Sequence, residues 1–197
     1  MIMDNSEVSA KVSANTEIKR QPTRPRALDL VYGPSPLLRT KSLPVEESEF
    51  GEALENFTKI MLESMINLKG AGLAAVQVGL LKRLFVANIK DSDIVMVNPE
   101  IVDSSEEMLS SQEGCLSLPL YRFGAIRHKS VTVKFRDPLG NKFEETYFDE
   151  EAVVIQHEIE HLDGITLLSK VSRLKQDIYK RKFRKLKKKL SRSSKRR

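Results

Sequence analysis

The chain contains a single cysteine among its 197 residues and lacks any long apolar run. A membrane-spanning helix needs roughly 18 or more consecutive apolar residues, and no segment approaches that length. The N-terminus also lacks the apolar core that defines a secretory signal peptide. One cysteine excludes an intramolecular disulfide, which suits a reducing compartment. We therefore expect a cytoplasmic protein, long enough for one domain with a proper core.

Residues 1–26 have few large apolar side chains and no periodicity, while Ser, Lys and Arg are frequent. Two kinds of segment share this composition, a disordered extension and an organelle transit peptide. Transit peptides are poor in acids, whereas Asp4, Glu7 and Glu17 interrupt this segment. We predict a disordered extension. A transit peptide would instead place the mature protein in an organelle stroma or matrix.

The net charge of +6 divides into two regions of opposite sign. Residues 170–197 hold 15 basic side chains and one acid, a net +14, and the other 169 residues hold 18 basic and 26 acidic side chains, a net −8. Such a basic segment is either a solvated helix face with a frayed end or a surface that attracts RNA. Binding to a membrane surface is a third interpretation, but the apolar face of the segment is thin.

The spacing of apolar residues predicts helices and strands in mixed order. From about residue 48 to residue 68, six apolar side chains recur at steps of three and four, which predicts a core-facing helix that ends at Gly70. Apolar and polar residues alternate over 131–135, which predicts a half-buried strand, and a Pro-Gly turn follows at 137–141. The expected strands cover residues 83–89, 94–97, 131–135 and 142–148.

Two further helices are predicted after these strands. Asp149 is a good N-cap for a helix that runs to about Leu162 and stops at Gly164, and a last helix with many basic side chains spans about 171–190. We predict an α+β fold with mainly antiparallel strands around the first of these helices, an N-terminal helix and a basic C-terminal helix. The expected units are an extension over 1–26, a catalytic domain over 27–170, and a basic helix and tail over 171–197.

The central helix carries His157-Glu158-Ile159-Glu160-His161, an H-E-x-x-H pattern. Residues four apart lie one above the other on a helix, so the two imidazoles can hold one cation. Glu158 lies close enough to take a proton from a metal-bound water. The alternative is a helix with two ordinary histidines, which is disfavoured because two of only three histidines in the chain fall here.

Zinc proteases share this pattern, so the third ligand decides the kind of enzyme. One class uses a downstream glutamate, but no glutamate follows Glu160; another uses a histidine six residues after the second, and that position is Leu167. His128 lies in a basic stretch and is expected at the surface. Cys115 is the better candidate, since its thiolate would complete a Cys/His₂ site with one open position. A lone cysteine is otherwise commonly a buried apolar group.

Three segments occur in a specific order along the chain. They are Gly70-Ala71-Gly72-Leu73-Ala74-Ala75-Val76-Gln77, Glu113-Gly114-Cys115-Leu116-Ser117 and Gln156-His157-Glu158-Ile159-Glu160-His161-Leu162-Asp163-Gly164. Together they resemble the three motifs of the peptide deformylase family, which removes the formyl group from the N-terminal methionine of new polypeptides. The glycine segment alone is also typical of an ordinary turn. The resemblance covers roughly residues 27–190.

The resemblance implies roles for most of these residues. The metal ligands would be Cys115, His157 and His161. The family prefers Fe²⁺, while Zn²⁺, Ni²⁺ and Co²⁺ suit the same ligands. Glu158 would accept the proton of the attacking water, and the Gln77 side chain and the Leu116 backbone N–H would stabilise the oxyanion. Gly72 would present its backbone to the substrate, because a missing Cβ permits close approach. Weaker candidates for the substrate cleft are Leu73, Leu118, Arg122, Ile126 and Val154.

One position departs from the family, which usually has aspartate where this chain has Glu160. We expect Glu160 to pair with a cation such as Arg127 and to tune the site rather than abolish activity. The implied partners are nascent N-formyl-Met polypeptides and, through the basic C-terminal helix, ribosomal RNA near the exit tunnel. Two other functions remain open, a metalloprotease of the H-E-x-x-H type and a ribosome-associated protein that binds no metal.

Overall fold

Five strands form one antiparallel sheet, and two more form a separate hairpin. In the computed structural model, which describes residues 28–90 and 92–194, the sheet order is β1-β2-β3-β6-β7, and β4 pairs with β5. The strands are β1 Gly72–Ala74, β2 Leu84–Ile89, β3 Ser92–Ser104, β4 Met108–Glu113, β5 Phe123–His128, β6 Ser130–Arg136 and β7 Lys142–Phe148. The helices are α1 Glu52–Asn67, α2 Asp149–Leu162 and α3 Arg173–Ser194, and the 3-10 helices are η1 Pro36–Arg39, η2 Glu47–Glu49, η3 Ala75–Val78 and η4 Leu167–Lys170. The predicted α+β class with mainly antiparallel pairing is confirmed.

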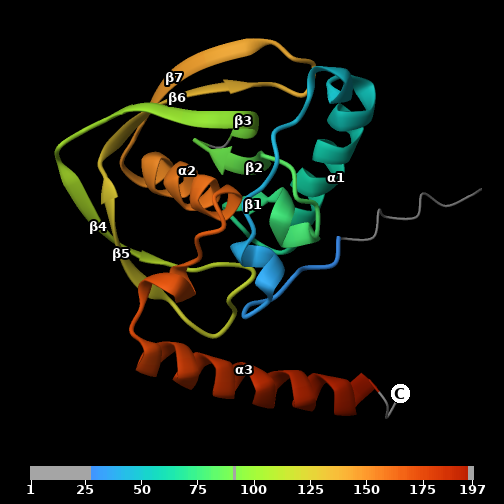
Figure 1. Ribbon diagram of the computed structural model, residues 1–197, viewed down its shortest axis with the longest axis vertical. Helices are drawn as coiled ribbons and strands as arrows, with labels where there is room; N and C mark the ends of the chain where they lie inside the picture. The colour runs from blue at the N-terminus through green and yellow to red at the C-terminus, as the bar shows by residue number, and fades with distance from the viewer. Residues whose placement is uncertain (1–27, 91, 195–197) are drawn as a thin grey trace, which may run out of the picture.

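Strand β2 is buried on both faces, because each face packs against a different helix. Successive side chains of a strand point to opposite sides. Phe85 shares a core cluster with Ile155 of α2, whereas Val86 shares a second cluster with Met61 of α1. Figure 1 shows the result, with α2 in the centre of the molecule and α1 at its side. Helix α2 is thereby fixed against the sheet along most of its length.

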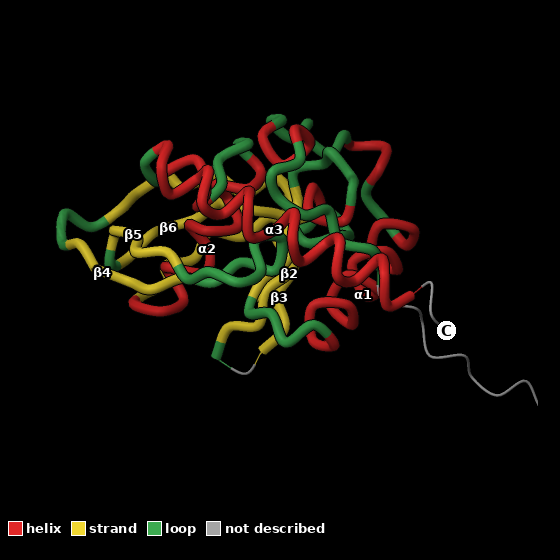
Figure 2. The backbone as a smooth tube through the Cα atoms, turned by 90° about the horizontal axis from the view of Figure 1, so that it is seen from below, coloured by secondary structure: helices red, strands yellow, loops and turns green. Residues whose placement is uncertain are grey.

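Helix α3 lies at one end of the molecule, where Figure 2 shows it running lengthwise across the surface. Tyr179 is fully buried, and its ring stacks on that of Phe183 with centroids 5.9 Å apart. Tyr121 and Phe123 pack on the same side chain, with centroids 6.3 and 6.4 Å from that of Tyr179. An aromatic cluster therefore anchors an otherwise very basic helix. No helix among residues 28–194 is long and apolar enough to cross a membrane.

Two predicted helix ends are wrong in detail. The left-handed residue after α1 is Lys69, with φ of 57°, and not Gly70. A Cβ on Gly70 would lie 2.7 Å from the end of the Leu116 side chain, so a larger residue here would displace Leu116. The cap of α2 is Phe148, which gives no side-chain capping bond. Asp149 has φ of 50° and donates its backbone N–H to the Lys129 carbonyl, so its backbone geometry does not suit the predicted N-cap.

Other expectations are confirmed or extended. Gly164 follows the end of α2 with φ of 73°, and a Cβ there would lie 2.7 Å from the Arg39 carbonyl oxygen. The strand expected at 94–97 is part of the longer β3, while β1, β4 and β5 have no counterpart among the four predicted strand ranges. The last helix begins at Arg173. The extension expected over 1–26 lies outside the described residues.

Candidate metal centre

Cys115, His157 and His161 come together as the sequence predicts. Their ligand atoms all lie within 4.8 Å of one another, and Cys115 Sγ is 3.2 Å from His161 Nε2. The two imidazoles project from adjacent turns of α2 with ring centroids 5.0 Å apart, and Cys115 follows β4. Metal–ligand bonds of about 2.0–2.3 Å place the ligands of one tetrahedral ion roughly 3–4 Å apart. A thiolate and two imidazoles at this spacing fit one divalent ion.

The two histidines differ in their electrostatic surroundings. Burial, together with the charges of His157 and Arg127, holds the pKa of His161 well below its ordinary value, so this imidazole is neutral. Burial also lowers the pKa of His157, but hydrogen bonds with Cys115 and Glu113 outweigh it and raise the pKa to about 10. A metal ligand must be a neutral imidazole, so a metal ion held by His157 would compete with a proton for this ring.

Glu158 is buried beside the cluster, with a carboxylate oxygen, Oε2, that has no hydrogen-bond partner among the described residues. Burial raises the pKa of Glu158 to about 7, although His157 and a backbone hydrogen bond from Ala74 lower it. A carboxylate with a pKa near neutrality is well matched to general base chemistry. Glycine is required opposite it, since a Cβ on Gly72 would lie 2.4 Å from Glu158 Oε1. The missing Cβ thus makes room for Glu158.

Glu113 holds His157 in place, a role that the sequence does not assign. Its Oε2 accepts a hydrogen bond from His157 Nδ1 at 2.8 Å, which leaves Nε2 of that ring for a metal. Arg127 donates to both oxygens of Glu113, at 2.7 and 2.8 Å. Burial raises the pKa of Glu113, but these hydrogen bonds more than offset it and hold the pKa far below its usual range. The only sequence signal for this role is the position of Glu113 within the second motif.

The predicted pairing of Glu160 with Arg127 is confirmed. Arg127 Nη1 lies 2.5 Å from Glu160 Oε1, and Lys170 forms an ion pair with the same oxygen. His128 is half-buried rather than exposed, and its Nδ1–H donates to the Ser105 carbonyl at 2.7 Å. His128 takes no part in the Cys/His₂ cluster.

Gln77 also lies at the cluster. Its Oε1 accepts a hydrogen bond from the Ala74 backbone N–H at 2.8 Å, which fixes the orientation of the amide. The Nε2 atom is then 3.1 Å from Ser117 Oγ and 3.6 Å from Cys115 Sγ. Leu116 lines the same cavity as Gln77. The two residues expected to supply the oxyanion donors therefore line the same cavity.

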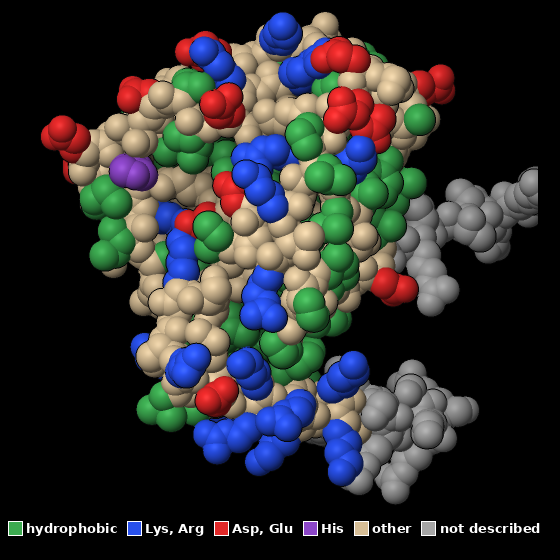
Figure 3. Space-filling view, viewed as in Figure 1, with side chains coloured by type: hydrophobic (Ala, Val, Ile, Leu, Met, Phe, Trp, Pro, Cys, Tyr) green, Lys and Arg blue, Asp and Glu red, His purple; other side chains and the backbone are tan. Residues whose placement is uncertain are grey.

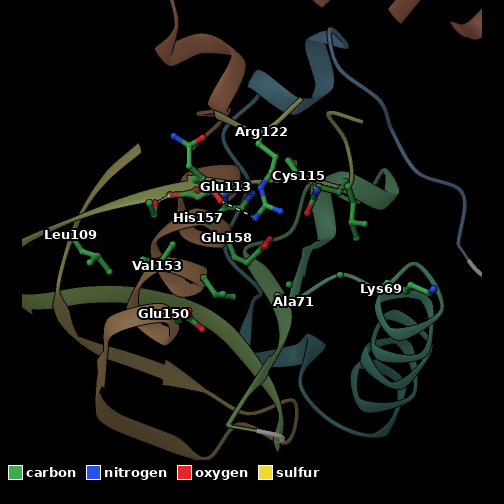
Figure 4. A pocket seen from close by; sticks show the side chains of 18 of the residues that line it. Lys69, Ala71, Leu109, Glu113, Cys115, Arg122, Glu150, Val153, His157 and Glu158 are labelled. Atoms are coloured by element: carbon green, nitrogen blue, oxygen red, sulfur yellow. Dashed lines mark hydrogen bonds and ion pairs between the residues drawn. The ribbon is translucent and has the colours of Figure 1, made fainter. Parts of the chain in front are cut away.

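A cavity of about 920 Å³ opens onto Cys115, His157 and Glu158. Figure 4 shows Leu109 and Lys69 on opposite sides of it. Of the expected substrate residues, Gly72, Arg122 and Val154 line the cavity. Leu73 and Leu118 lie instead in the apolar core, and Ile126 on β5 is 71% exposed and outside the lining. Lining residues that the sequence does not predict include Leu109, Ser110, Gln112, Glu150 and Val153.

Comparisons with known proteins agree in one family. A family model described as "Polypeptide deformylase" matches residues 27–177. A peptide deformylase of Rickettsia akari (strain Hartford) is 42% identical over 170 residues, covering 81% of this chain and 96% of the relative. A crystal structure of a peptide deformylase from Legionella pneumophila matches with a TM-score of 0.78 at 38% identity, covering 85% of this chain and 99% of that one. A Met-Ala-Ser-bound class I type b peptide deformylase from Acinetobacter baumannii matches with a TM-score of 0.72 at 30% identity, covering 75% and 100% of the two chains.

Proposed function

The chain belongs to the polypeptide deformylase family, and from this premise we propose that Cys115, His157 and His161 hold the divalent metal ion of the enzyme. The protein is a peptide deformylase, which removes the N-formyl group from nascent polypeptides, and the metalloprotease alternative is not favoured. The observation that carries the metal assignment is the convergence of one thiol and two imidazoles within 4.8 Å, beside a buried carboxylate.

The residues of the site divide the chemistry between them. A bound divalent ion supplies Lewis-acid polarisation and makes water acidic enough to react near neutral pH. Glu158, whose Oε2 has no partner among the described residues, accepts the proton of the attacking water and returns it to the leaving amine. The Gln77 amide and the Leu116 backbone N–H donate to the oxygen that becomes negatively charged, and each such donor typically contributes ~10²–10³ in rate.

The cavity beside these residues is the binding site of the formylated peptide. The Acinetobacter baumannii relative was crystallised with Met-Ala-Ser, a peptide of the size that a 920 Å³ cavity can receive. Gly72, Val154 and Arg122 line this cavity and would contact the chain that follows the formyl group. The Arg122 guanidinium donates to the Gln112 carbonyl at 3.0 Å, which holds the side chain across the loop before β5.

Replacing Glu158 by Gln tests the assignment of the base. The variant should keep its metal, because Glu158 is not a ligand, and should lose roughly 10²–10⁴ in turnover of a formyl-Met-Ala-Ser peptide. The matched control is Glu151→Gln, which changes the same group on the same helix at a position outside the cavity lining. Full activity of Glu158→Gln, or an equal loss in both variants, would remove Glu158 from this role.

We propose Fe²⁺ as the native ion, following the family resemblance. Imidazole and thiolate ligands suit iron as well as zinc, nickel and cobalt. Ferrous iron beside the Cys115 thiolate would make activity sensitive to oxygen, because the thiolate can be oxidised. Enzyme purified without oxygen should contain iron and lose activity in air. A preparation that stays fully active for days in air would contradict iron.

The basic residues of α3 form a surface for ribosomal RNA. Figure 3 shows Lys and Arg side chains gathered along the end of the molecule that α3 occupies. Lys175, Arg181 and Lys185 are exposed on this helix, while its aromatic residues face the body. Contacts with phosphates release counterions, so RNA binding weakens steeply as salt rises.

Co-sedimentation with ribosomes tests this surface. Changing Lys175, Arg181 and Lys185 to Gln keeps the aromatic anchor and should weaken co-sedimentation and reduce its salt dependence. The control changes three basic residues on α1, β6 and β7, at the opposite end of Figure 1, namely Lys59, Lys134 and Lys142. Ribosome binding that is insensitive to salt, or that is equally weakened by the control, would contradict the proposal.

A further inference from the structure

Five charged or ionisable side chains alternate in sign from the surface to a metal ligand. They are Lys170, Glu160, Arg127, Glu113 and His157. They come from η4, α2, β5 and β4, so no local stretch of sequence contains the series. Lys170 is 38% exposed at one end, whereas Arg127 is 2% exposed in the middle. The series therefore connects the solvent to the interior of the site.

Glu113 is shared between two donors. Its Oε2 accepts from Arg127 Nη2 at 2.8 Å and from His157 Nδ1 at 2.8 Å, so the guanidinium and the imidazole draw on the same oxygen. The third guanidinium nitrogen, Nη1, is directed to Glu160 at 2.5 Å. The negative charge of Glu160 offsets part of the positive charge of Arg127. More of the negative charge of Glu113 is then available to His157.

Lys170 has the opposite effect on this balance. Its ammonium group forms an ion pair with Glu160 Oε1, the same oxygen that Arg127 contacts. A second cation on that oxygen reduces the share of its charge that reaches Arg127. The buried guanidinium pairs with both carboxylates, so a change at Glu160 alters the charge balance that Glu113 shares with it.

We propose that Glu160 and Lys170 are positioning residues that set the affinity of the site for its metal ion in opposite directions. Glu160 strengthens metal binding by compensating Arg127, and Lys170 weakens it by compensating Glu160. Ligand histidines commonly depend on a carboxylate that holds their second ring nitrogen, and Glu113 is that carboxylate here. The inference rests on the proposed metal ligands Cys115, His157 and His161, and it concerns residues that do not touch the metal.

Titration of the full-length apoprotein with Co²⁺ against a chelator measures the effect directly. The sulfur-to-cobalt charge-transfer absorption reports occupancy at Cys115. Glu160→Gln should raise the dissociation constant by about 3- to 10-fold, less than the ~10–100-fold typical of a partner that contacts the ligand itself. Glu160→Asp, which keeps the charge, should recover most of this loss. Lys170→Met should lower the dissociation constant slightly, since its exposed end is screened by water.

A double variant and a matched ion pair complete the experiment. Lys170→Met should have no effect once Glu160 is already Gln, because Lys170 acts through that carboxylate. Glu151 and Lys90 form the control pair, since Glu151 lies on the same helix, is 13% exposed, and binds Lys90 at 3.0 Å without reaching Arg127. Glu151→Gln and Lys90→Met should leave Co²⁺ affinity unchanged.

The outcomes separate this inference from the metal site itself. A wild-type chain that binds no Co²⁺ would overturn the proposed ligands. If the wild type binds Co²⁺ normally and Glu160→Gln has the same dissociation constant as Glu151→Gln, the inference is overturned but the proposed ligands are not. Weaker Co²⁺ binding in both Glu160→Gln and Lys170→Met would also overturn it. Lost packing would weaken binding in both variants, whereas the proposed charge effect changes the affinity in opposite directions. If thermal unfolding shows that Glu160→Gln does not fold, the surface variant Lys170→Met remains as the test. It should bind Co²⁺ more tightly than the wild type, and unchanged or weaker binding would overturn the inference.

Discussion

The contact between Gly72 and Glu158 leads to a quantitative prediction for Gly72→Ala. The new methyl carbon would lie 2.4 Å from Oε1, 2.7 Å from Cδ and 2.8 Å from Cγ of Glu158. Non-bonded heavy atoms prefer separations of about 3.5–4.0 Å, so the carboxylate must move by roughly 1 Å. Glu158 is only 3% exposed, and its Cγ also lies well inside normal contact distance of the new methyl carbon, so rotation of the carboxylate alone does not relieve the clash.

A displacement of this size should appear mainly in turnover. Misplacement of a catalytic group by about 1 Å costs on the order of 10²-fold in rate, or ~2.7 kcal/mol of transition-state stabilisation. Release of formate from formyl-Met-Ala-Ser gives kcat, and elemental analysis of the same sample gives the metal content. We expect kcat to fall while one metal per chain is retained, because the atoms nearest the new methyl group belong to Glu158 and not to any of the three proposed ligands.

Two comparisons make the result interpretable. Gly114→Ala adds the same methyl group next to Cys115, where nothing lies within 4 Å, so its kcat should stay near that of the wild type. In a Glu158→Gln background, Gly72→Ala should cost little more, since the group that it displaces has already lost its function. Wild-type kcat in Gly72→Ala would refute the reasoning, as would a full additional loss in the double variant.

Three further variants test the ligand set and the packing. Cys115→Ser should lower the metal content per chain, and an unaltered content would remove Cys115 from the ligands. Arg127→Met leaves the buried Glu113 carboxylate without its main partner and should lower the free energy of unfolding in urea by ~3–5 kcal/mol; a loss below that of an ordinary surface change would contradict this. At Gly164, φ is 73° and a new Cβ would lie 2.7 Å from the Arg39 carbonyl oxygen. Gly164→Ala should therefore lower the free energy of unfolding by about 1–3 kcal/mol. An unchanged thermal midpoint would contradict the packing argument.

Features that depend on local spacing are predicted well from the sequence. The four-residue step between His157 and His161 places both rings on one face of any helix, so no tertiary information is needed. Cys115 follows because the other candidate ligands are missing from the chain. Likewise, alternation over 131–135 predicts which side chains of β6 are buried, and all three expected positions are buried.

Features that depend on distant side chains are not predicted. Glu113 and His157 are 44 residues apart, and no periodicity connects them. The role of Gly72 is similar, because only the folded chain reveals that Glu158 occupies the space of its absent Cβ. Charge alone does predict the pairing of Arg127 with Glu160, but not the second cation, Lys170, on the same carboxylate oxygen.

Helix α3 shows how one buried side chain changes the interpretation of a charged segment. Its basic residues alone suit a solvated tail as well as an RNA surface. Tyr179, however, is fully buried and packs edge-on against Tyr121, and Lys182 lies 5.1 Å above the same Tyr121 ring. Tyr121 directly precedes Arg122, which lines the cavity. A helix held at this loop keeps a fixed position relative to the cavity, so RNA bound to α3 would lie at a fixed distance from the catalytic residues. A frayed tail would impose no such distance, so the aromatic anchor supplies the fixed geometry that the proposed RNA surface needs.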